Sequence, residues 1–309
     1  MGSASVTVTP LETILRRDRA VVLGALGVVV LASWAYVLAG SGMGMSVWKM
    51  SSLDLALGRV NPMPMAEVSG GAISGGTMNT GEMSGGHLSD TICEAMATPA
   101  RWNLEYAGIM VSMWWVMMIA MMVPSAAPVI LLHARVARHG QERGGAAGRA
   151  STAAFVAGYL ACWLGFSAIA TLLQFGLESF GLLDGMMMWS TERWLTAGLL
   201  IGAGLYQLSP LKSVCLTQCR SPAEFLARHW RPGRFGAFQL GVRHGAYCLG
   251  CCWALMLLLF AAGIMNLLWI AGLSILVLLE KLAPFGAALT KPLAVLLLFA
   301  GAALLVVSG

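Results

Sequence analysis

Charged side chains are scarce in this chain of 309 residues: Asp, Glu, Lys and Arg make up 11%, whereas 58% of the residues are hydrophobic. An ordinary soluble domain has about 25% charged residues, because it must cover its surface with polar groups. The mean hydropathy of +0.76 is too high for such a surface. The composition therefore excludes a cytosolic enzyme, a nucleic-acid-binding domain and a disordered chain.

Sequence motifs of common enzyme classes are also missing. The chain contains no Gly-x-Ser-x-Gly, His-Glu-x2-His, phosphate-loop or dinucleotide-binding pattern, so neither a hydrolase nor a nucleotide-driven pump is supported. The sequence favours a binding or transport protein over an enzyme. A copper oxidase or oxygenase is disfavoured because the five histidines are scattered along the sequence, at His87, His133, His139, His229 and His244.

Long apolar runs dominate the sequence instead. Runs of about 20 hydrophobic residues fit membrane-spanning helices and not the alternating pattern of barrel strands. They predict an all-α polytopic membrane protein, embedded in the lipid bilayer, with seven transmembrane helices. The fourth run is short and the fifth and sixth are nearly continuous, so six helices are the alternative. The expected spans are residues 20–39, 107–132, 152–175, 194–208, 246–262, 264–282 and 292–307.

The distribution of Lys and Arg predicts a cytoplasmic N-terminus. Positively charged residues accumulate in the inner segments of membrane proteins. With seven spans and the N-terminus inside, fifteen of the nineteen basic residues are inner, and the outer ones are Lys49, Arg59, Arg101 and Arg193. The net charge of +5 is therefore a topology signal, and no nucleic-acid partner is expected.

Three regions follow from this topology. Residues 1–40 form a cytoplasmic lead and the first transmembrane helix. Residues 41–106 form a periplasmic loop rich in Met, Gly and Ser, and residues 107–309 form a helical membrane core with inner Cys-rich segments. The loop has too few large apolar residues to fold alone.

Methionines in the periplasmic loop are candidates for metal capture. Thioether sulfur is a soft ligand that favours copper(I), and it binds without releasing a proton. Met78, Met83 and His87 have the spacing Met-x4-Met-x3-His. The alternative is a flexible loop in which methionine is merely tolerated.

A second set of methionines lies in the second expected span. Met110, Met113, Met117 and Met121 are spaced by three, four and four residues, which places them on one helical face. Thioethers about one helical turn apart can pass a copper(I) ion along, and a Met-x3-Met pair also occurs on the pore-lining helix of eukaryotic copper importers. The alternative is packing, since methionine fills gaps between helices well. Pro124 is expected to kink this helix.

Cysteines give the most specific pattern. Cys215 with Cys219, and Cys248 with Cys252, are i,i+4 pairs that present two sulfurs on one side of a helix. His244 lies one turn before Cys248, and Cys251 is about 100° from Cys252 around the helix, so its replacement should matter less. Two facing pairs would suit zinc with four thiolates, or copper(I) with two or three. The alternative is that these cysteines are small packing residues, and disulfides are disfavoured in the reducing cytoplasm.

Glu280, next to Lys281, is a separate candidate, for a buried carboxylate.

Three segments carry a family resemblance: MWWVMMIAMMVPSAAPVILL, then CLTQC, then YCLGCCWALMLLLFAAGIMNLLWIAGLSILVLLEKL. They resemble a bacterial family of predicted metal-binding integral membrane proteins, classed as a domain of unknown function. The similar part extends roughly over residues 106–291. The resemblance implies a multi-pass protein of the bacterial inner membrane.

Two functional hypotheses remain. In the first, the protein handles copper(I): outer methionines capture the ion, methionines of the second span carry it, and the inner cysteines receive it. In the second, the protein is an assembly or accessory subunit of a membrane metalloenzyme. The inner cysteines then form a structural zinc site and the methionines serve packing. Co-purification with a stable partner would favour this hypothesis, and the candidate partners are another membrane protein or a second copy of the chain.

Overall fold

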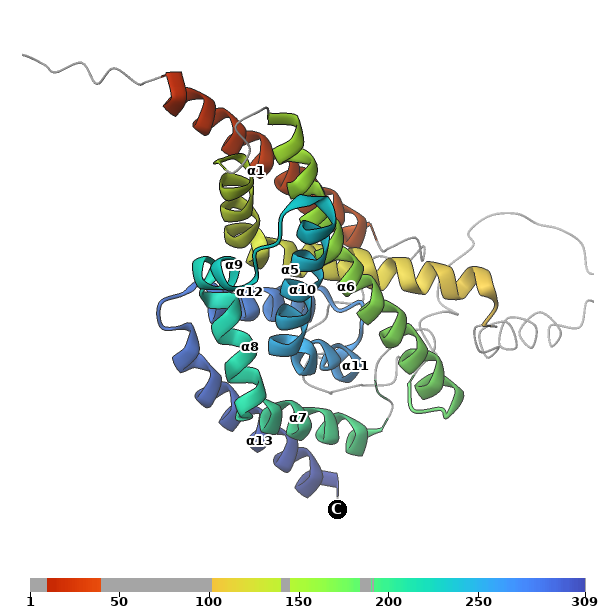
Figure 1. Cartoon of the computed structure of the whole chain (residues 1–309). Coiled ribbons are helices and arrows are strands. Elements are labelled where there is room, and N and C mark those ends of the chain that lie inside the picture. The colour runs from red at the N-terminus through yellow and green to blue at the C-terminus, as the bar shows by residue number, and fades with distance from the viewer. Residues whose placement is uncertain (1–9, 40–101, 140–144, 184–189, 191, 309) are drawn as a thin grey trace, which may run out of the picture.

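The computed structural model describes residues 10–39, 102–139, 145–183, 190 and 192–308, which form a bundle of helices (Figure 1). An isolated antiparallel bridge joins Leu183 to Ser190. The all-α class is therefore confirmed for the described residues. The loop candidates Met78, Met83 and His87 lie outside them. The helices are α1 (Pro10–Leu38), α5 (Leu104–His139), α6 (Gly145–Ser179), α7 (Arg193–Gln207), α8 (Pro210–Arg220), α9 (Pro222–His229), α10 (Gly233–Leu257), α11 (Leu259–Ala262), α12 (Leu267–Leu282) and α13 (Gly286–Ser308).

Five helical segments of the described chain are long and apolar enough to cross a membrane: α1, α5, α6, α10 with α11, and α13. A sixth crossing results if α7 and α8, which meet at 65°, act as one bent span. The sixth expected span, residues 264–282, corresponds to α12, which has 16 residues. At 1.5 Å per residue it is about 24 Å long, shorter than the roughly 30 Å hydrocarbon layer. The count of seven and the cytoplasmic N-terminus stay predictions.

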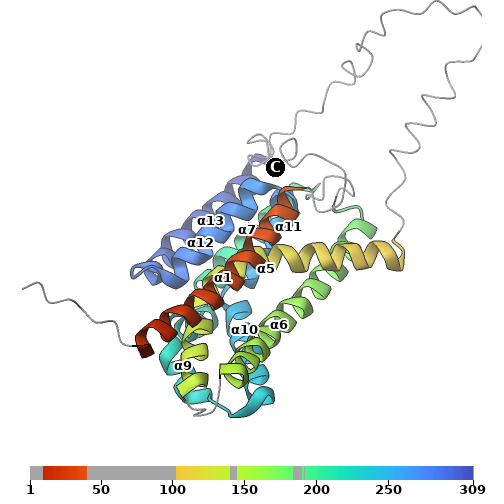
Figure 2. The same ribbon diagram turned by 90° about the horizontal axis from the view of Figure 1, so that it is seen from above.

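Helix α5 changes direction partway along its length (Figures 1 and 2). Pro124 and Pro128 lie inside the helix, and a proline removes a backbone hydrogen bond and clashes with the preceding turn. Beside the bend, the carbonyl of Met122 accepts hydrogen bonds from the hydroxyls of Ser125, at 2.8 Å, and Tyr159, at 3.1 Å. The bend therefore fits the kink predicted at Pro124.

Helices α6 and α10 pack with their backbones in close approach. A Cβ atom on Gly241 would lie 2.0 Å from the carbonyl oxygen of Phe155, and one on Gly158 would lie 2.1 Å from that of Phe238. Small residues spaced four apart, here Gly241 and Gly245, let membrane helices approach in this way. This packing brings the cysteine-bearing turns of α10 against Tyr159 of α6.

The start of α10 differs from the sequence expectation. The fifth apolar run was expected to begin at residue 246, but α10 begins at Gly233. Cys248, Cys251 and Cys252 therefore lie well inside a long buried helix. Arginines at positions 234 and 243 interrupt the apolar run in this helix, so the run alone predicted too late a start.

Candidate metal site: a buried cluster of thiols

Four cysteine side chains from two helices form one cluster, called here the thiol cluster: Cys219 of α8 and Cys248, Cys251 and Cys252 of α10. The thiols of Cys251 and Cys252 each donate a hydrogen bond to the backbone carbonyl of Cys248, at 3.0 Å, and the thiol of Cys219 lies beside those of Cys248 and Cys251. The cluster is buried, with exposed fractions of 9% for Cys219 and 1% for the other three. The pairing of α8 with α10 that the cysteine spacing predicted is therefore present, although with a different set of sulfurs.

Cys215 does not join the thiol cluster. It packs against Gly250, where an added Cβ atom would come within 2.7 Å of the Cys215 sulfur. The carbonyl of Gly250 also accepts a hydrogen bond from the hydroxyl of Tyr206. The replacement of Cys251 was expected to matter less than that of the paired cysteines. In the structure, however, the thiol of Cys251 lies beside that of Cys219.

A buried lysine contacts the thiol cluster. Lys281, 4% exposed, donates hydrogen bonds to the Cys248 sulfur at 2.9 Å and to the Ser125 hydroxyl at 3.2 Å. The hydroxyl of Tyr159 lies 3.2 Å from the same sulfur. An ammonium ion removed from water needs a compensating charge, and a thiolate at Cys248 would supply one.

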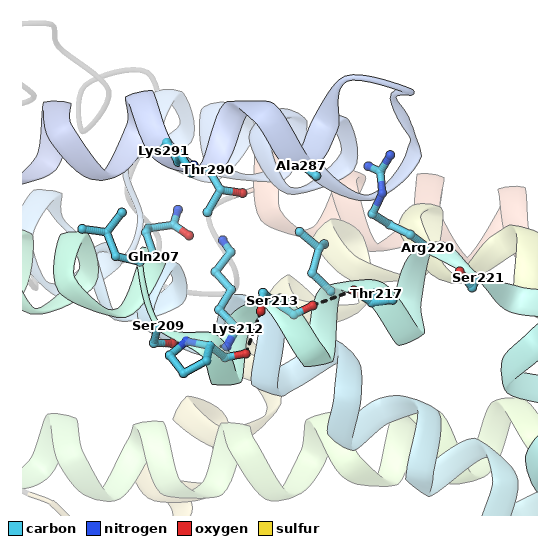
Figure 3. A pocket seen from close by; sticks show the side chains of 13 residues that line it. Gln207, Ser209, Lys212, Ser213, Thr217, Arg220, Ser221, Ala287, Thr290 and Lys291 are labelled. Carbon is cyan, nitrogen blue, oxygen red and sulfur yellow. Dashed lines mark hydrogen bonds between the residues drawn. The ribbon is translucent and has the colours of Figure 1, made fainter.

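The neighbouring residue on α12 has its own partner. Glu280 forms a salt bridge with Lys212 of α8, with distances of 2.8 and 3.1 Å to its two carboxylate oxygens. Gln207 donates a weaker hydrogen bond to Glu280 at 3.4 Å. Lys212 and Gln207 line a pocket of about 450 Å³ between α8 and α13, beside Thr290 (Figure 3). Glu280 is thus paired with Lys212, whereas the ammonium of Lys281 contacts the Cys248 sulfur.

All four predicted methionines of α5 are buried, with exposed fractions of at most 1% at Met110, Met113, Met117 and Met121. At one end, the Met110 sulfur accepts a hydrogen bond from Gln174 at 3.7 Å. At the other end, the sulfur of Met122 lies 3.9 Å from that of Cys252. The buried methionines of α5 therefore extend from Gln174 to the thiol cluster.

Sequence reasoning did not place Met122, Ser125, Tyr159 and Lys281 at the site. Met122 lies next to the predicted stripe of methionines, so its position was within reach of that argument. Tyr159 and Lys281 reach the site through packing between distant helices, for which the sequence holds no local signal. His244, 2% exposed, lies beside the cluster and not in it, surrounded by the rings of Phe155, Tyr159 and Phe225.

The donor set suits a soft ion with few ligands. Within the described residues, no group of three or more His, Cys, Asp or Glu side chains has the geometry of a metal site. A tetrahedral zinc site takes four such donors. Copper(I) accepts two or three sulfur ligands, including thioethers, and adjacent thiols with the Met122 thioether offer that chemistry.

Comparison with known proteins gives one match. A family model described as a copper chaperone, PpoB2, matches residues 111–304. The matched part begins within α5, ends within α13 and includes every cysteine of the described residues. No protein of curated function and no solved structure matches the chain.

Proposed function

Since the chain belongs to the PpoB2 family of copper chaperones, we propose that its cargo is copper(I) and that the thiol cluster holds the ion inside the membrane. The observation that carries this proposal is the contact of Lys281 with the sulfur of Cys248, one of four buried cysteines gathered at this point. A copper(I) ion bound by two thiolates has a net charge of −1. The Lys281 ammonium neutralises that charge in a region where water cannot.

The methionines of α5 supply a route to the cluster. Thioethers are neutral, so a buried row of them does not need counter-charges, and each can bind copper(I) as a soft ligand. The 3.9 Å contact between the sulfurs of Met122 and Cys252 is the point of transfer from thioether to thiol. The ion then gains affinity as it moves from thioether ligands to thiolates.

Capture of the ion by the outer methionines is part of the same proposal. Several weak ligands on one loop raise the local concentration of the ion near the entrance. Deletion of residues 63–87 should lower copper loading at limiting copper and leave the thermal stability of the protein unchanged. Equal loading of the deletion variant and the parent protein would remove the loop from the mechanism.

Copper(I) titration of the purified protein tests the proposal. The protein is kept under reducing conditions in detergent and competes with a colorimetric copper(I) chelator. We expect the parent protein to bind copper(I), and Cys248→Ser to bind at least about tenfold more weakly. Cys162→Ser is the matched control, because Cys162 is a cysteine of α6 outside the thiol cluster. Absence of binding by the parent, or equal binding by the parent and Cys248→Ser, would overturn the proposal.

A further inference from the structure

Three of the five histidines of the chain gather around two phenylalanine rings, although they lie far apart in the sequence. His133 of α5 stacks on Phe155 of α6 with ring centroids 4.7 Å apart. The ring of His244 of α10 lies 6.1 Å from that of Phe155 and 5.1 Å from that of Phe225 of α9. His229 of α9 also contacts Phe225, at 5.1 Å. The fold thus converts scattered histidines into a compact group of imidazole and aromatic rings.

Two of these histidines have an unusual feature in common. The Nδ1 atoms of His133 and His244 are buried and have no hydrogen-bond partner, and the residues are 1% and 2% exposed. Buried polar atoms are nearly always paired, so each exception needs an explanation. His229 differs, because its Nδ1 lies 3.0 Å from the carbonyl oxygen of Phe225. Among the histidines whose side chains the structure describes, His133 and His244 are thus the two with a buried ring nitrogen that has no hydrogen-bond partner.

The position of these rings relates them to the thiol cluster. His244 precedes Cys248 by one helical turn, and Tyr159, whose ring is 5.9 Å from His244, contacts the Cys248 sulfur. His133 lies beyond Phe155, against Trp230 at the end of α9. Helix α5 thus contributes thioethers before its bend and an imidazole after it. Helix α9 lies at the end of the bundle opposite the C-terminal end of α13 (Figure 2).

We propose that His244 and His133 are two transient copper(I) ligands, through which the ion leaves the thiol cluster towards the end of the bundle formed by α9. The inference rests on the proposed function, since it needs copper(I) in the cluster. A neutral imidazole nitrogen is a good ligand for copper ions. The ring of Phe155, near both histidines, is aromatic, and aromatic rings attract a cation that has lost its water. Single imidazole nitrogens bind too weakly to retain the ion, as release requires.

The test separates the rate of release from the affinity. Copper(I)-loaded protein in detergent is mixed with a large excess of a water-soluble copper(I) chelator, and the chelate is followed by stopped-flow absorbance. Affinity is measured separately by equilibrium competition with the same chelator. His244→Phe and His133→Phe keep an aromatic ring in the stack and remove the nitrogen ligand. We expect both variants to release copper(I) at least about tenfold more slowly than the parent, with affinities within about threefold of it.

His229→Phe is the matched control, and it should release copper(I) at the rate of the parent. His244→Gln and His133→Gln, which are polar but lack an imidazole, should also be slow, so the result does not depend on one variant folding. Release at the parent rate by all four variants overturns the relay while the copper site stands. A loss of equilibrium affinity in His244→Phe overturns it too, because His244 would then hold the ion in the cluster. If the parent protein binds no copper(I), the proposed function and this inference both fail.

Discussion

The ammonium nitrogen of Lys281 lies 2.9 Å from the sulfur of Cys248 and joins α12 to α10 inside the protein. Within the described residues, the other buried cation of a lysine belongs to Lys212, and it is paired with Glu280. The buried side chains of these two lysines and one carboxylate carry a net charge of +1, and one thiolate would bring that charge to zero. A copper(I) ion bound by two thiolates keeps that balance.

Removal of the Lys281 charge should weaken copper(I) binding. Lys281→Met retains an unbranched apolar side chain but leaves the charge of −1 on the copper–thiolate group uncompensated, which is costly in an apolar interior. We expect the affinity to fall at least about tenfold, equivalent to about 1.4 kcal/mol, in competition with a copper(I) chelator. Lys291→Met, at an exposed lysine of α13, is the control and should bind like the parent. Equal affinities for Lys281→Met and the parent would show that the lysine has no part in binding.

The sulfurs of the thiol cluster should act as one unit. An ion held by sulfurs from both α8 and α10 loses its coordination when either helix lacks its ligand. Cys219→Ser and Cys248→Ser should therefore each weaken binding nearly as much as the double variant, a non-additivity expected for residues in contact. Losses that simply add would indicate separate sites.

Cys215 and Cys251 provide a second comparison of the same kind. The sequence pattern ranks Cys215 above Cys251, whereas the contacts of the structure reverse the order. We expect Cys251→Ser to weaken copper(I) binding more than Cys215→Ser does, in the same competition measurement. The opposite order would support the pairs chosen from spacing alone.

The difference between the predicted and observed sets of cysteines has a physical reason. Spacing along a helix correctly predicted that Cys215 and Cys219 share a side of α8, and that Cys248 and Cys252 share a side of α10. Which of these sulfurs meet depends on how the two helices cross, and Gly250 sets that locally by admitting Cys215 against the backbone of α10. The metal-binding roles of all these residues stay predictions.

Lys281 and the histidines show more strongly that spacing along one helix does not predict contacts between helices. Lys281 lies near the end of an apolar run, and nothing in that run predicts that its side chain donates hydrogen bonds to a thiol of α10 and a hydroxyl of α5. His133 and His244 are scattered in the sequence and close in space because α5, α6 and α10 pack around Phe155. Sequence periodicity describes the faces of a single helix. Each of these contacts depends instead on how two or three helices pack together.

Gly241 should be essential for the packing of α6 against α10. Gly241→Ala would place a Cβ atom 2.0 Å from the carbonyl oxygen of Phe155, and a backbone atom cannot move aside cheaply. The helices would have to separate, which disturbs both the thiol cluster and the rings around His244. We expect a lower melting temperature and weaker copper(I) binding, measured in detergent. Gly165→Ala in α6, where nothing lies within 4 Å of the added atom, is the control and should leave both unchanged.

The salt bridge between Lys212 and Glu280 should stabilise the protein mainly by avoiding an unpaired buried charge. Both side chains are at most 2% exposed, so Glu280→Gln leaves the lysine charge in an apolar region, at a cost of about 3–5 kcal/mol. The melting temperature of this variant should fall clearly in a thermal scan. The double variant Lys212→Met/Glu280→Gln removes both charges and should recover most of the lost stability, because it leaves no unpaired charge in the interior. A double variant as unstable as Glu280→Gln would show that the ion pair itself, and not the avoidance of a lone charge, holds α8 against α12.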